Sequence, residues 1–101
     1  MPIKSKKIIA VHPGEIIADI LEELGARKVH LARQLRVSSA YVSDIIAGKR
    51  GISAEMAFKL SLVLGSTPRM WMNLQKNWEL SRVSIEDLGK FKKLEPEKEA
   101  A

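Results

Sequence analysis

Apolar residues recur at intervals of three and four positions over most of this chain, which is the period of amphipathic α-helices. No stretch alternates apolar and polar residues for long, and the single strand candidate, residues 7–11, is short. The pattern therefore predicts an all-α fold.

Capping and breaking residues divide the periodic stretch into five short predicted helices. Proline favours the first turn of a helix, serine and threonine cap the N-terminus, and glycine commonly ends the helix. These signals start the five helices at Pro13-Gly14, near Lys28, and after Ser38, Ser53 and Thr67. They end the first four at Gly25, near Leu35, at Gly48 and at Gly65.

One face of each predicted helix is apolar, and we expect these faces to form the core. The inward residues are Ile16, Ile17, Ile20, Leu21 and Leu24, then Leu31, Ala32 and Leu35, then Val42, Ile45 and Ile46, and then Met56, Ala57, Leu60, Val63 and Leu64. In the fifth helix Trp71, Leu74 and Trp78 share one apolar face. The predicted organisation is an N-terminal arm over residues 1–11, a helical domain over residues 12–83 and a charged tail over residues 84–101. The end of such a tail is expected to be frayed or disordered.

Composition narrows the classes of function. The chain has 101 residues and no cysteine, which excludes disulfides, thiolate metal sites and cysteine nucleophiles and fits a cytoplasmic protein. No apolar run is long enough to span a membrane. The formal net charge is +5, with an excess of bases mid-chain and in the arm, where Lys4, Lys6 and Lys7 could follow a DNA backbone or be solvated. This charge favours a polyanionic partner.

The second and third predicted helices are joined by only about three residues, Arg36-Val37-Ser38. So short a connection forces a sharp reorientation, as in a helix-turn-helix unit. Ala32 is small where the two helices would cross most closely, and Val37 is apolar and can fill the corner. The spacing therefore predicts a helix-turn-helix.

Residues 28–53 resemble the helix-turn-helix of phage-repressor-type (XRE) regulators, and the stretch from His12 to about Leu80 is similar to the HigA-type antitoxins of bacterial toxin–antitoxin pairs. The matching segments are His12-Pro13-Gly14-Glu15, Leu31-Ala32 through Val42-Ser43, Gly48 through Ser53, Met56-Ala57, and Pro68 with Trp71, Asn73, Leu74 and Gln75. The resemblance implies a five-helix, phage-repressor-like domain in a homodimeric repressor. Such a protein binds its own double-stranded operator DNA and a cognate toxin, typically one that cleaves mRNA.

The chain departs from many such motifs in the turn after the second helix. Arg36 stands where glycine with a positive φ is common. A non-glycine residue in that conformation costs about 1 kcal/mol. The turn could therefore differ slightly from its usual geometry in this chain.

The resemblance implies that bases are read by Ser39, Ala40, Ser43 and Asp44, on the face of the third helix opposite its buried stripe. These side chains offer hydroxyls, a methyl group and a carboxylate that can accept from cytosine N4. None is Arg, Asn or Gln, so DNA shape is expected to share the specificity. A merely polar helix face is the alternative interpretation.

Candidate phosphate contacts are Arg27, Lys28, Ser38, Lys49 and Arg50. Arg27 and Lys28 place positive charge at a helix N-terminus, where it opposes the helix dipole unless an anion binds there. Ser38 could act simply as an N-cap. Lys49 and Arg50 follow a helix C-terminus, where cations are favourable in any case.

Two further surfaces are candidates for protein partners. Glu15, Asp19, Glu22 and Glu23 form an acidic strip opposite the isoleucines of the first helix, which could bind a basic toxin or simply be solvated. In the fifth helix, Trp71, Leu74 and Trp78 are candidates for the dimer interface or the core.

Catalysis, metal binding and cofactor binding find no support in the sequence. The only two histidines, His12 and His30, are far apart and have no cysteine partner, and no glycine loop could cradle a phosphate. We expect His12 at the start of the first helix and His30 on an exposed face. The function that the resemblance implies, a DNA-binding antitoxin, is therefore the favoured interpretation. A free-standing repressor and a helical interaction module that binds DNA weakly are the alternatives.

Overall fold

The computed structural model describes residues 10–97, and this part of the chain contains five α-helices and no strand. The elements are α1 (Pro13–Leu24), α2 (Lys28–Leu35), α3 (Ser39–Ile46), α4 (Ala54–Val63), α5 (Pro68–Ser81) and a short 3-10 helix η1 (Glu86–Leu88). The all-α prediction and its five helices are confirmed. Most of the strand candidate lies outside the described residues, and its last two residues, Ala10 and Val11, are not in a strand.

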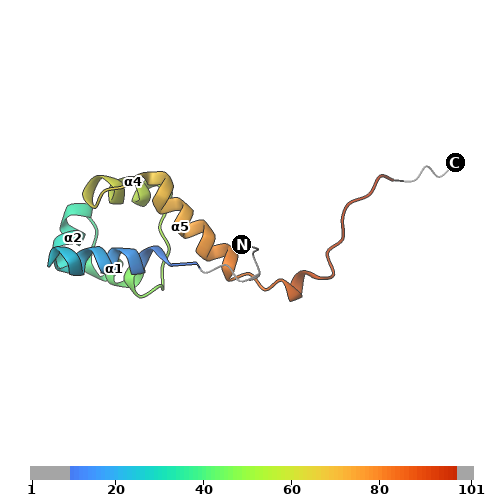
Figure 1. The fold of residues 1–101 in the computed structure, drawn as a ribbon, viewed down its shortest axis with the longest axis horizontal. Helices are drawn as coiled ribbons and strands as arrows, with labels where there is room; N and C mark the ends of the chain where they lie inside the picture. Colours follow the sequence, from blue (N-terminus) through green and yellow to red (C-terminus); the bar gives the residue numbers. More distant parts are fainter. Residues whose placement is uncertain (1–9, 98–101) are drawn as a thin grey trace, which may run out of the picture.

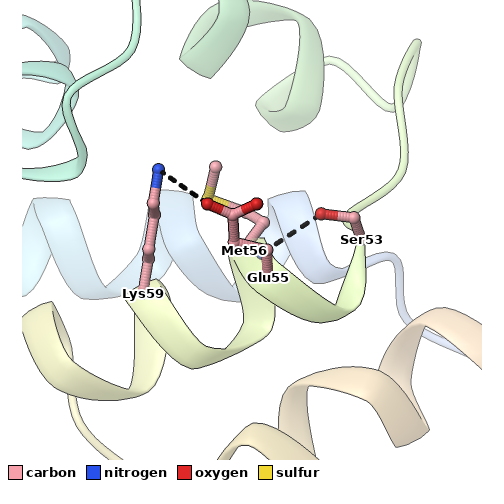
Figure 2. Close-up of polar contacts among 4 residues, drawn as sticks. All are labelled: Ser53, Glu55, Met56 and Lys59. Carbon is pink, nitrogen blue, oxygen red and sulfur yellow. Dashed lines mark hydrogen bonds and ion pairs between the residues drawn. The ribbon is translucent and has the colours of Figure 1, made fainter.

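Side-chain caps explain where the helices begin. The hydroxyl oxygens of Ser38, Ser53 and Thr67 each accept a hydrogen bond from the amide three residues further on, all at 3.1 Å. Figure 2 shows the cap at Ser53, together with a 3.7 Å ion pair between Lys59 and Glu55 on the exposed side of α4. These three caps were predicted from the sequence, and each satisfies an amide that the helix leaves free.

The predicted core is largely confirmed. Buried apolar residues from all five helices and from Ile52, between α3 and α4, form one cluster. Two predicted core residues are exposed instead: Leu24 is 67% exposed and Val63 is 37% exposed. Each is the last residue of its helix, α1 or α4, and both line one open hollow on the surface.

Close packing of α1 on α3 depends on Gly14. A Cβ atom at this position would overlap the backbone carbonyl of Ile45. The first turn of α1 therefore lies directly against the last turn of α3. From the sequence, Gly14 was predicted only as part of a helix start, because the neighbouring residues do not indicate which helix packs against α1 at this position.

The elements form a small helical body from which α5 leads into an extended C-terminal segment (Figure 1). In this body α3 packs on α1 and α2, while α4 packs on α2 and α5. Residues 79–97 are all exposed, in agreement with a thinly apolar tail that adds little to the core. The domain boundaries stay a prediction, and the lysines of the N-terminal arm lie outside the described residues.

Candidate DNA interface

The turn between α2 and α3 has the geometry of a helix-turn-helix. Arg36 lies in the left-handed region with φ of 61°, so this non-glycine residue adopts the conformation that glycine usually supplies. The Val37 amide donates to the Ala32 carbonyl at 3.0 Å, and the Arg36 amide donates to the Arg33 carbonyl at 3.1 Å. These bonds close the end of α2 as the chain reverses. Val37 is half-buried and packs against the core, as predicted.

The buried side of α3 fixes which residues face outward. Val42 and Ile45 are each 1% exposed and anchor the helix in the core. Of the predicted base-reading residues, Ser39 and Ala40 are exposed, while Ser43 and Asp44 are half-buried. An exposed N-terminal tip is the part of a recognition helix that contacts base edges in this motif. The four residues thus lie on α3 outside its buried stripe.

The predicted phosphate contacts lie at helix ends around this face. Arg27 precedes α2 in extended conformation and its side chain makes no capping hydrogen bond, and Lys28 is the first residue of the helix. Both are exposed, as are Lys49 and Arg50 after α3. Ser38 accepts the hydrogen bond from the Tyr41 amide, so its N-cap interpretation is confirmed.

Arg50 has a defined position although it is exposed. Its guanidinium carbon lies 4.4 Å from the centroid of the Tyr41 ring, within the range of a cation–π contact. Tyr41 is half-buried on α3 and packs against the core. The contact joins the loop after α3 to a side chain of α3 itself.

The acidic strip of α1 lies on the surface, as predicted. Glu15, Asp19, Glu22 and Glu23 are all exposed. All of these except Glu15 line a shallow open groove with the half-buried Ile16 and Ile20. The surface therefore combines negative charge with apolar contacts, which suits a basic protein partner better than DNA.

One predicted interface residue is corrected by the structure. Trp71 is fully buried within the protomer, and its indole Nε1–H donates to the Gly65 carbonyl at 3.0 Å. A side chain with no exposed surface cannot contact a second copy, so Trp71 belongs to the core. Leu74 and Trp78 are half-buried, and their interface role stays a prediction.

His12 is a buried polar residue whose partners were not predicted from the sequence. It lies at the start of α1, as expected, and its Nδ1 accepts from the Gly14 amide at 2.9 Å. The ring meets Trp78 of α5 edge-on, with centroids 4.7 Å apart. Burial lowers the pKa of His12, and the nearby Glu15 carboxylate opposes that shift. His30 is exposed, as expected.

Gln75 is the second buried polar residue, and its role was not predicted beyond its match to the family motif. Its Oε1 accepts from the Ile52 amide at 2.8 Å, and its Nε2 donates to the Glu79 carboxylate at 2.7 Å. A polar residue within the apolar face of α5 was the available signal, since buried amides require partners. Its partner lies 23 positions away and could not be read from the sequence.

Two features that would suggest other classes of protein were not found in the described part of the chain. Between residues 10 and 97 no three acidic, histidine or cysteine side chains gather as a metal site would require. Over the same residues no helix has the length and apolar character needed to cross a membrane.

Comparison with known proteins identifies the family. Residues 17–71 match the helix-turn-helix family, a stretch that contains both α2 and α3. The chain is 42% identical over 69 residues to an uncharacterised helix-turn-helix-type transcriptional regulator of Escherichia coli, covering 68% of this chain and 73% of the relative. It is 34% identical over 86 residues to antitoxin HigA-1 of Vibrio cholerae, covering 82% and 81%.

Solved structures agree with this assignment. One of them is the antitoxin HigA of Pseudomonas aeruginosa, whose structure was determined with the higBA promoter. This chain is 38% identical to it with a TM-score of 0.72, and the match covers 81% of this chain and 89% of the HigA chain. The resemblance inferred from the sequence motifs is therefore confirmed. This chain belongs to the helix-turn-helix family of DNA-binding regulators that includes the HigA antitoxins.

Proposed function

We propose that the protein is a sequence-specific DNA-binding antitoxin, which represses its own operon as a homodimer and neutralises a cognate mRNA-cleaving toxin. The observation that carries this proposal is the match to the helix-turn-helix family across α2 and α3, joined to the similarity to HigA solved with its promoter. Operator DNA and an mRNA-cleaving toxin both act in the bacterial cytoplasm, so we propose that location. The family is one of DNA regulators, and we propose no enzymatic activity.

In the proposed complex α3 enters the major groove of the operator. Ser39, Ala40, Ser43 and Asp44 would contact base edges, and the basic residues at the flanking helix ends would contact phosphates. Arg27 and Lys28 would bring a phosphate to the N-terminus of α2, where free amides and the helix dipole favour an anion. The proposed base-reading residues include no Arg, Asn or Gln, which supports the proposal that recognition of DNA shape contributes to the specificity.

The acidic groove of α1 is the proposed toxin-binding surface. Its carboxylates would pair with basic side chains, and Ile16 and Ile20 would supply apolar contact. Charged and polar groups arranged in this way mainly give specificity and fast association. The DNA interface and the toxin interface would then lie on different helices.

A free-standing repressor is the second candidate function. It is favoured by the similarity to the Escherichia coli protein, which is named only as a transcriptional regulator. The antitoxin function would be supported by a neighbouring gene that encodes a short basic protein, if that protein co-purifies with this chain when the two are expressed together. The absence of such a gene would favour the free-standing repressor.

Two variants test the proposed DNA contacts. Lys28→Ala removes a phosphate partner, so affinity should fall by a similar factor for operator and for scrambled DNA. One lost contact per subunit should reduce the slope of log affinity against log salt by roughly two in a dimer. Asp44→Ala should strengthen non-specific binding and weaken the preference for the operator, since one good base contact contributes about 1–3 kcal/mol of discrimination.

Titrations at several salt concentrations, with the DNA upstream of the gene and a scrambled duplex, measure both effects. An unchanged slope for Lys28→Ala together with an unchanged operator preference for Asp44→Ala would show that α2 and α3 do not contact DNA as proposed. The third candidate, a helical interaction module that binds DNA weakly, would then be favoured.

A further inference from the structure

The loop between α3 and α4 carries two basic residues and is held at several points. At its start the Lys49 amide donates to the Asp44 carbonyl at 2.9 Å. Near its end the Ile52 amide donates to the side-chain oxygen of Gln75 at 2.8 Å. A Cβ atom on Gly51 would overlap the Gln75 amide group, so the loop backbone lies directly on this side chain.

Gln75 is suited to hold the loop because hydrogen bonds at both its amide oxygen and its amide nitrogen fix the orientation of the side chain. The residue is 4% exposed, its oxygen accepts from the loop, and its nitrogen donates to Glu79 one helical turn further along α5. A buried hydrogen bond of this kind is costly to lose, since the Ile52 amide would be left without a partner. The hydrogen bond to Gln75 on α5 therefore fixes the backbone at Ile52, two residues after Arg50.

Tyr41 holds the side chain of Arg50 in turn. The guanidinium lies over the tyrosine ring at 4.4 Å, and among the described residues Arg50 forms no ion pair with an acidic side chain. An aromatic ring attracts a cation through its π-electrons, so the guanidinium N–H groups can still donate to phosphate oxygens.

We infer that Tyr41 and Gln75 are positioning residues that hold Arg50 ready for a DNA phosphate, Tyr41 by fixing the guanidinium and Gln75 by fixing the loop backbone. The inference rests on the proposed DNA-binding function and extends it to two residues that need not touch DNA. Binding is stronger when a flexible side chain is already ordered, because less conformational freedom is lost in the complex. The role of Gln75 also links α5 to the DNA-contacting loop.

The test measures binding of the full-length protein to a duplex of the DNA upstream of its gene at several salt concentrations. Tyr41→Leu removes the ring, and Gln75→Met removes both hydrogen bonds with little change in volume. Each should weaken binding roughly fivefold or more, since Arg50 would then have to be ordered on binding in both subunits of a dimer. Each should also shift the salt slope toward that of Arg50→Ala. Tyr41→Phe keeps the ring and should bind like the wild type.

The decisive measurement repeats both substitutions in the Arg50→Ala protein. If Tyr41 and Gln75 act through Arg50, neither substitution should weaken binding further once the guanidinium is absent. An equal loss in both backgrounds would overturn the inference and assign these residues a purely structural role. Thermal unfolding identifies a variant that does not fold, and Tyr41→Leu, at a half-buried position, tests the inference independently of Gln75→Met.

The wild-type protein distinguishes failure of this inference from failure of the proposed function. Wild-type binding with a steep salt slope supports the proposed function, and the variants then decide the inference alone. No salt-dependent binding by the wild type would overturn the proposed function and the inference with it.

Discussion

At the scale of single residues, the polar side chains differ in how far along the chain their partners lie. Ser38, Ser53 and Thr67 each cap an amide three residues further on, so both partners belong to the same local segment. The partners of His12 and Gln75 on other elements depend on how distant helices meet. A residue type alone states that a buried partner is needed, without stating which one.

His12 makes folding stability depend on pH. Because burial lowers its pKa in the folded state, the unfolded chain binds a proton more readily as the pH falls below about 6.5. The free energy of unfolding should therefore decrease with falling pH through that region and level off below the folded-state pKa. Protonation also removes the Nδ1 acceptor for the Gly14 amide and adds positive charge at the N-terminus of α1.

The His12→Asn variant provides the comparison, because asparagine is also a good N-cap and does not titrate. Unfolding midpoints measured from pH 7.5 to 5 should fall more steeply for the wild type than for His12→Asn. Parallel curves for the two proteins would mean that His12 has the same proton affinity in the folded and unfolded chains.

At the scale of elements, helix limits were predicted from local signals, whereas helix crossings were not. The limits of α1 follow from Pro13 and Gly25, which act within one turn of the chain. The contact of Gly14 with the Ile45 carbonyl joins α1 to α3 and has no local signal. Periodicity also assigned Leu24 and Val63 to the core, but both are exposed at the last positions of their helices, where they line an open hollow.

The proposed role of the outer face of α1 in toxin binding can be tested by charge reversal. Reversing the charge of Glu22 and Glu23 to lysine should weaken binding to the toxin, because a basic partner would meet repulsion in the groove. Operator affinity should stay the same or rise, since the change adds positive charge away from α3. Isothermal titration with the toxin and a DNA-binding titration measure the two effects.

The matched control reverses Glu95 and Glu97 in the exposed C-terminal segment, an identical change in net charge at another place. If both double variants bind the toxin equally well, the acidic strip is only a solvated face. A loss confined to the α1 variant would support the groove as the toxin-binding surface.

At the scale of the whole molecule, the fold leaves apolar surface that a single protomer does not cover. Leu80 at the end of α5 is 67% exposed, and Leu74 and Trp78 on the same helix are half-buried. The sequence predicted α5 as a dimerisation helix, and with Trp71 assigned to the core these residues form the proposed interface. A dimer would also suit an operator whose two half-sites lie about 34 Å apart.

We therefore expect a homodimer in solution at tens of micromolar, detectable by sedimentation velocity. Leu80→Asp should shift the protein toward monomer, because a carboxylate would be desolvated in an apolar interface without a partner. Leu94→Asp makes the same chemical change in the C-terminal segment, at a residue that is also exposed, and should leave the dimer intact. A wild-type protein that sediments only as a monomer would exclude the homodimer. Equal dissociation by both substitutions would place the interface in the C-terminal segment as well as α5.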